Sequence, residues 1–565
     1  MCGISGIVGP GADRGKLMEM VKTQNHRGPD FTGIWEDSGE VSLGHNRLSI
    51  VDLSEAANQP FHSDDDRYHL VFNGEIYNYL EIRTVLEDFF VFNTASDTEV
   101  LLKAWIHWGE SCLDRFNGMF AFAIWDQQEK SLFAARDRFG VKPFYYHHSS
   151  DTLSFASEIP ALFANGIEKI PNQSVWAGFF AHGTYGLPNE TFWQGIHQLP
   201  AGHLLHWKDG VLNLKQWYDF VGRVKALVGT SHEDEEKYIT ELLKDSIKLR
   251  FRADVPVGFN LSGGLDSSTL LALVSDAFPH NSEIEAFTFY TADERYDELP
   301  WVEEMMKDRP YPLNKCLISA AEIPALTNTI SKLQVEPFGG VPTLAYGKVF
   351  EAARKKGILV LLDGQGSDEA WAGYDYYFKK GGSLVQGVKS SPVKADALSK
   401  DFQSKSGNSA HPQPFDDRLL NLQYRDLFYT KIPRALRFND RMSMAYSTEL
   451  REPFLDYRLV EYVFSRPTEF KVKDGIQKWL LRKIAGNYLG DNISLAPKRP
   501  LQTPQREWLG TELQVWAGEQ IQWLGENTDW FDVEILDKYW KEYIAGDRDN
   551  SFYIWQWINA AAILK

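Results

Sequence analysis

The pattern of apolar residues changes near residue 231, and this change constrains the fold more than any other sequence feature. Before it, short β-rich runs separated by turns follow one another, among them YHLVFNGEIYN (68–78) and GMFAFAIWD (118–126), a pattern typical of antiparallel sheets. After it, apolar runs alternate with helical patterns, as in a parallel sheet covered by helices. A chain of 565 residues is also too long for a single hydrophobic core. We therefore predict two domains, 2–210 and 211–565.

The elements expected in each half define the fold class. In the first half, helical spacing of apolar residues predicts helices over 14–24, 79–88 and 97–110 beside the strands, which is an α+β arrangement. In the second half, VPVGFNL, IEAFTFYT and ILVLLD each lead into polar or glycine residues, which indicates an α/β domain whose ligands bind at the carboxyl edge of the sheet. Residues 380–415 contain few apolar residues and predict a mobile insertion or lid, and 416–565 are expected to be mostly helical.

Charge and cysteine usage exclude several classes of protein. Lys and Arg number 59 against 77 Asp and Glu, a net charge of -18, which disfavours nucleic acid as a partner. The three cysteines are too far apart in sequence for a metal knuckle or a disulfide framework. No signal peptide and no apolar stretch of ~18 residues is found, so we predict a cytoplasmic protein that does not bind membranes.

Cys2 is a candidate nucleophile because of its position. Removal of Met1 would leave Cys2 with both a thiol and a free α-amine, and an amine with a pKa of ~8 can accept the thiol proton. The alternative is that position 2 holds an ordinary small residue.

The neighbours of Cys2 favour the first interpretation. MCGISGIVG, HRGPD (26–30), RLSIVD (47–52), FNGEIYN (72–78), SDTE (96–99) and ARDRFGVKP (135–143) follow in this order, and the set resembles the class II glutamine amidotransferases. The resemblance implies an Ntn-hydrolase αββα sandwich in which Cys2 is catalytic and Asn73 and Gly74 form the oxyanion hole. It also implies a glutamine site that contains Asn73, with Arg47 on the α-carboxylate and with Glu75 and Asp97 on the α-ammonium.

A phosphate-binding turn is predicted at NLSGGLDSSTLLALV (260–274). This segment passes from an apolar strand through glycines and hydroxyls into a helix, where backbone N–H groups, serines and the helix N-terminus favour an anion. It is not a Walker A loop, because no G-x-x-x-x-G-K-[ST] occurs. A plain strand-to-helix turn is the alternative.

SGGLDSS is similar to the loop of PP-loop ATP pyrophosphatases, and VLLDGQGSDEAWAGY and STELREPFLDYRLVEY resemble the synthetase half of glutamine-hydrolysing asparagine synthetases. The similarity spans about 2–510 and weakens over the last fifty residues. It implies a Rossmann-like PP-loop domain with added helices, ATP and Mg²⁺ as cofactors, glutamine and a carboxylate acceptor as substrates, an acyl-adenylate intermediate and a homodimer.

The same resemblance implies roles for individual residues. Catalytic Lys478, with Arg482 nearby, would stabilise phosphate charge, and Asp266 and Asp368 would bind Mg²⁺. The implied ATP-binding residues are Leu261, Ser262, Gly263, Gly264, Asp266, Ser267, Ser268, Phe289, Asp363 and Gly364. The implied acceptor pocket contains Gln365, Glu449 and Arg451, with Asp297 and Glu298 beside it.

One departure from the family concerns Gln365, where asparagine synthetases commonly carry glutamate. An amide cannot accept a proton at working pH, so another group or the product phosphate handles protons, or the acceptor is not aspartate. We hypothesise that Gln365 hydrogen-bonds the adenylate.

The leading interpretation is asparagine synthesis from aspartate, ATP and glutamine. The rivals are amidation of a sugar acid, peptide or natural-product intermediate, a non-catalytic relative, and a β-lactam-forming cyclase.

Overall fold

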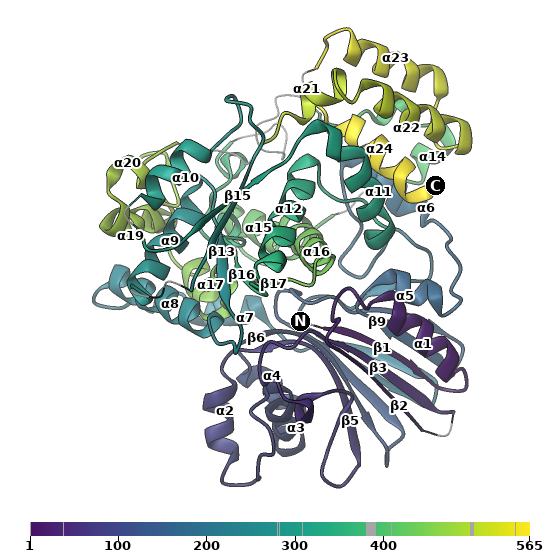
Figure 1. Cartoon of the computed structure of the whole chain (residues 1–565), viewed down its shortest axis with the longest axis vertical. Coiled ribbons are helices and arrows are strands. Elements are labelled where there is room, and N and C mark those ends of the chain that lie inside the picture. The colour runs from purple at the N-terminus through teal and green to yellow at the C-terminus, as the bar shows by residue number, and fades with distance from the viewer. Residues whose placement is uncertain are drawn as a thin grey trace.

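The computed structural model describes residues 2–37, 39–279, 281, 283–307, 309–379, 391–407, 410–497, 502–548 and 550–565. Figure 1 presents a lower body made of two sheets with helices on their outer faces, and an upper body of helices around a parallel sheet. Among the described residues, no helix is long and apolar enough to cross a membrane.

The amino-terminal domain contains two six-stranded sheets. The first has the order β10 (His197–Gln198), β8 (Tyr145–Ser149), β9 (Thr152–Ala156), β1 (Gly3–Val8), β3 (Val41–Arg47) and β2 (Phe31–Asp37). The second has the order β12 (Val211–Gln216), β11 (His203–Lys208), β7 (Ser131–Arg136), β6 (Gly118–Asp126), β5 (Tyr68–Ile76) and β4 (Phe61–His62). The predicted domain limit at residue 210 falls in the turn between β11 and β12, which pair with each other, so the sheet continues to Gln216.

Helices cover the outer faces of both sheets. The helices α1 (Arg14–Thr23) and α5 (Ile159–Ala164) contact the first sheet, and α2 (Tyr79–Leu86), α3 (Asp97–Trp108) and α4 (Cys112–Arg115) lie by the second. Between the sheets, inward residues such as Ile4, Val71 and Trp125 form one apolar cluster, because alternate side chains of each strand point to the same face. These are the layers of an αββα sandwich, as the resemblance to the class II glutamine amidotransferases implied. The helices expected over 14–24, 79–88 and 97–110 are confirmed within about two residues.

The second domain is built on a five-stranded parallel sheet with the order β15 (Leu313–Leu317), β14 (Ala286–Tyr290), β13 (Val257–Asn260), β16 (Val360–Leu362) and β17 (Glu449–Arg451). The chain passes outward from β13 to β14 and β15 and then returns to the other side of β13. Such a reversal places a crevice at the carboxyl ends of the central strands. The three strands predicted from sequence are confirmed, and β15 and β17 are additional.

Helices surround this sheet on both faces in Figure 1. They include α8 (Glu235–Arg250), α9 (Leu265–Ala277), α12 (Val341–Lys355), α16 (Lys431–Met444), α17 (Tyr457–Phe464) and α19 (Trp479–Leu489). The helical and aromatic-rich carboxyl-terminal part ends in α22 (Gln514–Asn527), α23 (Val533–Ile544) and α24 (Phe552–Leu564). Gln556 of α24 donates to the carbonyl of Phe179 in α6 (Gln173–His182) at 2.6 Å. The last helix therefore packs into the core and is not an appendage.

The predicted insertion at 380–415 lies partly outside the described residues, which omit 380–390 and 408–409. Within the described part, α14 (Lys400–Ser404) is anchored. The ring of Phe402 stacks on Trp530 with centroids 4.8 Å apart, and Phe402 is buried. One aromatic side chain therefore joins this helix to the carboxyl-terminal helices, and the mobility expected for 380–415 stays a prediction.

Two candidate active sites

Cys2 stands immediately before β1, in the middle of the first sheet. Its backbone N–H donates to Asn73 Oδ1 at 3.0 Å, and its carbonyl accepts from Arg27 Nε at 3.0 Å. Burial raises the pKa of the Cys2 thiol, and the nearby Arg47 guanidinium only partly opposes this effect. A buried thiol of this kind reacts only if a neighbouring base removes its proton.

The cavity at Cys2 gathers residues from separate segments. Five of the residues singled out from sequence line it: Cys2, Arg47, Gly74, Glu75 and Asp97. Asn73 is not part of the lining, but its Oδ1 holds the backbone of Cys2, and its Nδ2 is buried without a hydrogen-bond partner within the described structure. That amide group therefore keeps a free donor beside the thiol residue.

Gly74 follows Asn73 in β5, where the backbones of β5 and β6 approach closely. A Cβ atom at this position would lie 2.1 Å from the carbonyl oxygen of Met119. Any side chain would separate the two strands, since real Cβ atoms do not come within 3 Å of backbone oxygens. The strand pairing therefore requires glycine here and fixes the position of its N–H.

Arg47 is held by the loop that follows it. Its Nη1 donates to the carbonyl of Ser54 at 2.7 Å and to Asn58 Oδ1 at 2.8 Å, and its Nη2 donates to the carbonyl of Asp52. These bonds use three of the five guanidinium N–H groups. The remaining Nε–H and Nη2–H form the planar fork that matches a carboxylate.

Two carboxylates, those of Glu75 and Asp97, line the same cavity as Arg47. Burial is the main cause that raises the pKa of Glu75, and it raises the pKa of Asp97 to about 6. Asp97 Oδ2 accepts from the N–H of Ile76 at 2.9 Å. Desolvated carboxylates of this kind gain from a bound cation.

The structure corrects the prediction for Glu449 and Arg451. Both are fully buried at 0% exposure, and Arg451 donates to Glu449 and to the carbonyls of Arg250 and Arg252. Its Nη2 lies 3.6 Å from Glu75 of the other domain. The register of β17 beside β16 places Arg451 against the amidotransferase domain. Neither side chain lines the cavity at the loop between β13 and α9, so Arg451 is not exposed to an acceptor there.

The loop between β13 and α9 contains the glycines and serines for which the sequence predicts a phosphate site. Ser267 Oγ donates to the carbonyl of Ser262, and the N–H of Gly263 donates to Glu298 Oε2 at 3.0 Å. A carboxylate oxygen therefore occupies the place where the N–H of Gly263 would meet a phosphate oxygen. Ser268 is buried and donates to the carbonyl of Gly264 at 2.7 Å, so it supports the turn.

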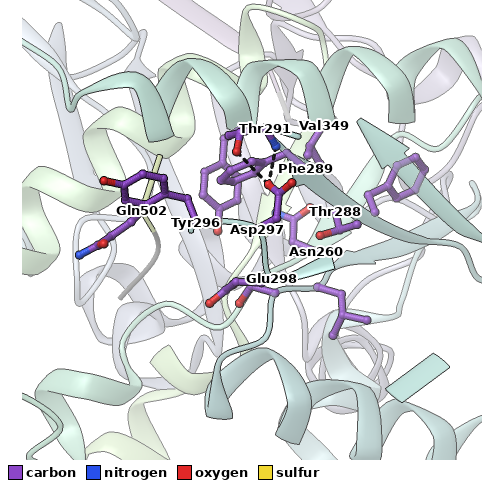
Figure 2. Close-up of a pocket in the computed structure, with 13 residues that line it drawn as sticks. Asn260, Thr288, Phe289, Thr291, Tyr296, Asp297, Glu298, Val349 and Gln502 are labelled. Carbon is purple, nitrogen blue, oxygen red and sulfur yellow. Dashed lines mark hydrogen bonds between the residues drawn. The ribbon is translucent and has the colours of Figure 1, made fainter. Parts of the chain in front are cut away.

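A cavity opens beside this loop at the carboxyl edge of the sheet, shown in Figure 2. Its lining includes Leu261, Ser262 and Phe289 from the predicted nucleotide site. Asp297 and Glu298, predicted for the acceptor, line this same cavity, and Asp297 Oδ1 accepts from the N–H of Thr291 at 2.6 Å. Sequence reasoning missed Tyr346 and Gln502, which also line it, because neither lies in a recognisable motif.

Lys478 lies between the two predicted metal-binding carboxylates. Its Nζ is 2.7 Å from Asp266 Oδ1 and 2.7 Å from Asp368 Oδ1. Burial lowers the pKa of Lys478, but the two carboxylates outweigh it, so the pKa is raised. A Cβ at Gly373 would lie 1.9 Å from Asp368 Oδ1, which explains the glycine.

These two carboxylates suit a magnesium ion, which is often bound by one or two carboxylates together with phosphates. The ammonium of Lys478 stands in for a cation between them. Within the described ranges, no group of three or more His, Cys, Asp or Glu side chains gathers for a metal. Asp266 and Asp368 are therefore suited to a cation shared with a ligand.

The remaining residues that the sequence predicts for the second domain lie near Asp266 and Lys478. Gly364 faces Asp266, where an added Cβ would be 3.0 Å from the Asp266 Cβ. Burial raises the pKa of Asp363 to about 6, and its Oδ2 has no partner in the part of the chain described. Gln365 is half-buried. Arg482 donates to the carbonyls of Gln477, Ser494 and Ala496, so it supports the loops near Lys478.

A charged group that sequence reasoning left unassigned connects the domains. Arg27, at 0% exposure, donates to Asp440 Oδ2 at 2.9 Å and to Glu158 Oε1 at 2.8 Å while it holds the Cys2 carbonyl. The residue lies inside HRGPD, but its partner Asp440 follows 413 positions later. No local pattern could have joined them.

The fold and its two cavities define a class: a glutamine amidotransferase domain joined to a nucleotide-dependent amide-forming domain. Family models agree, since that of a glutamine amidotransferase domain matches residues 1–218 and that of asparagine synthase matches 238–565. The second match reaches the carboxyl terminus and so includes the last fifty residues, where the sequence led us to expect a weaker similarity.

Individual relatives extend this comparison. The chain is 31% identical to asparagine synthetase [glutamine-hydrolyzing] 3 of Bacillus subtilis, over 88% of this chain and 86% of the relative. It is 29% identical to asparagine synthetase [glutamine-hydrolyzing] 1 of the same organism, over 98% and 95%. It is 28% identical to the amidase chry2 of Gibberella zeae, over 91% and 90%. The chain belongs to the glutamine-hydrolysing asparagine synthetase family, whose members are ATP-using carbon–nitrogen ligases.

Proposed function

We propose that this enzyme makes asparagine and glutamate from aspartate, glutamine and ATP, with AMP and pyrophosphate as the other products. The observation that carries the proposal is the cavity at Cys2, where an arginine fork and two desolvated carboxylates surround one buried thiol. A free amino acid offers the complementary carboxylate and ammonium.

In the glutaminase step, the Cys2 thiolate attacks the side-chain amide carbon of glutamine, the C–N bond breaks, and a thioester and ammonia form. Water then hydrolyses the thioester, which releases glutamate and restores the Cys2 thiol. After removal of Met1, the α-amine of Cys2 accepts the thiol proton and returns it to the leaving nitrogen. The free Nδ2 of Asn73 and the N–H of Gly74 stabilise the oxyanion. This assignment is supported by the bond from the Cys2 N–H to Asn73 Oδ1, which leaves Nδ2 as the available donor.

Recognition of glutamine follows from charge. The free fork of Arg47 binds the α-carboxylate, and Glu75 and Asp97 bind the α-ammonium. Binding of the ammonium favours the ionised forms of both acids, since an opposite charge lowers a raised carboxyl pKa.

In the synthetase step, the turn from Ser262 to Ser268 binds the phosphates of ATP, and the acceptor carboxylate attacks the α-phosphorus to form an acyl-adenylate and pyrophosphate. Lys478 stabilises the negative charge that develops on the phosphates. Asp266 and Asp368 would hold Mg²⁺, which would neutralise phosphate charge when bound. Ammonia from the first domain then replaces AMP on the acyl carbon.

A second candidate is amidation of a carboxylate other than aspartate. It is favoured by the burial of Arg451, which leaves the acceptor pocket without its predicted carboxylate ligand, and by Gln365. The similarity to a fungal protein named as an amidase also supports it.

The test measures pyrophosphate release with glutamine, ATP and a panel of carboxylic acids, with the amide identified by mass. Aspartate-dependent asparagine would support the first candidate, and amide formation from another acid only would support the second. Cys2→Ala should abolish glutamine hydrolysis and keep synthesis from ammonia. Cys112→Ala is the matched control, because Cys112 is also buried but lies in α4 and does not line the cavity.

A further inference from the structure

Amide formation from an acyl-adenylate leaves a proton to be removed. The nitrogen of ammonia forms a bond to the acyl carbon, the bond from that carbon to the AMP oxygen breaks, and one N–H proton must leave the new amide. Gln365, at the carboxyl edge of the sheet, cannot accept this proton. A carboxylate at that edge that the proposed function does not use is therefore a candidate for this base.

Glu452 is such a group. It follows Arg451, the last residue of β17, which pairs in parallel with Leu362 of β16. The N–H of Asp363 donates to the carbonyl of Arg451 at 2.9 Å. Glu452 therefore lies one residue beyond the sheet, beside Asp363 of the loop that also contains Gln365.

The side chain of Glu452 is buried but not bonded. The residue is 4% exposed, and across the described ranges its carboxyl group makes no hydrogen bond or ion pair. Other buried glutamates of this domain differ. Glu449 accepts from Arg451, and Glu461 accepts from the Tyr218 hydroxyl at 2.8 Å. The carboxyl oxygens of Glu452 are therefore available to accept a proton.

Charged groups from both domains act on Glu452. Lys142 of the amidotransferase domain and Arg250 of α8 favour its ionised form, and Asp363 and Asp440 oppose it, while burial is the largest effect and raises the pKa to about 8. Lys142 is itself buried, and its Nζ is 3.8 Å from Asp440 Oδ1. Glu452 thus lies between the amidotransferase domain, which would release ammonia, and the loop that would hold the adenylate.

We propose that Glu452 is the general base of amide formation and accepts the proton that ammonia loses as it displaces AMP. The inference rests on the proposed function, because it needs an acyl-adenylate and ammonia. It applies to aspartate or to any other acceptor, since the proton comes from the nitrogen. General bases of this kind contribute about 10²–10⁴-fold.

The pKa of Glu452 determines how the rate of amide formation should depend on pH. With a pKa of about 8, Glu452 is mostly protonated at neutral pH and becomes a base as the pH rises. At a fixed concentration of neutral ammonia, the rate of amide formation should increase up to pH ~8 and then level off.

The test compares Glu452→Gln with the wild-type enzyme in two assays, ammonia-dependent amide formation and acceptor-dependent exchange of pyrophosphate into ATP. Glutamine resembles the protonated acid in shape, which favours normal folding. We expect amide formation to fall at least ~10²-fold and to lose its rise toward pH ~8, with exchange within about threefold of wild type. Glu461→Gln is the control, with both activities near wild type.

A second substitution tests whether Glu452→Gln acts through the loss of a base or through a change of structure. Adding Gln365→Glu to Glu452→Gln returns a carboxylate to the same sheet edge and should recover amide formation at least ~10-fold. The proposal is overturned if Glu452→Gln keeps the wild-type rate and pH profile, or if exchange and amide formation fall together and the double variant recovers neither. A wild-type enzyme that exchanges pyrophosphate but forms no amide with any acid would instead overturn the proposed function, and this proposal with it.

Discussion

Replacement of Asn73 tests whether its side chain stabilises the oxyanion or only positions Cys2. Asn73→Ala removes both the free Nδ2 donor and the acceptor of the Cys2 N–H. Loss of one oxyanion donor costs about 2.7–4 kcal/mol, which at about 1.4 kcal/mol per tenfold predicts a 10²–10³-fold fall in kcat for glutamine hydrolysis. The KM for glutamine should change little, because the donor acts on charge that develops in the transition state.

Asn73→Asp separates the two roles. Aspartate keeps an acceptor for the Cys2 N–H but has no N–H and adds negative charge where the oxyanion forms. We expect a loss at least as large as for Asn73→Ala. The assay is steady-state release of glutamate, with ammonia-dependent synthesis as an internal control. Asn78→Ala serves as the matched variant, since Asn78 bonds the carbonyl of Arg115 away from the cavity. Activity of Asn73→Asp within threefold of wild type would refute the oxyanion role.

Three further predictions follow from charges in the two sites. Lys478→Met should lower pyrophosphate exchange at least ~10²-fold and leave glutamine hydrolysis intact; exchange above a tenth of the wild-type rate would contradict the role of Lys478. Asp440→Asn weakens a buried ion pair with Arg27, so the protein should lose about 3 kcal/mol of stability in denaturant unfolding and hydrolyse glutamine more slowly; unchanged hydrolysis would disprove the link to Cys2. Because the pKa of Asp97 is raised to about 6, its carboxyl group is protonated at lower pH and loses its attraction for an ammonium. The KM for glutamine should therefore rise below pH 6, and a constant KM between pH 7 and 5 would argue against this contact.

Local patterns in the sequence indicated most helices and strands and several of the residues that line the two cavities. Period-two alternation and helical spacing predicted most of the strands and helices that build the αββα layers and the parallel sheet, because each pattern reflects one buried face. Short strands escaped this reasoning. The three residues of β17 are too few to establish a period. The sequence therefore assigns its first and last residues, Glu449 and Arg451, to a pocket that they do not line.

The sequence by itself determined the order of domains, the thiol at position 2 and the glycine–serine turn, since these depend on residues adjacent in the chain. Only the tertiary structure decided which distant charges meet. It brought Arg27 to Asp440, Lys478 between Asp266 and Asp368, and Glu452 beside Asp363. The physical reason is that a buried charge is stable only among the partners that folding supplies, and those partners lie up to 413 positions away.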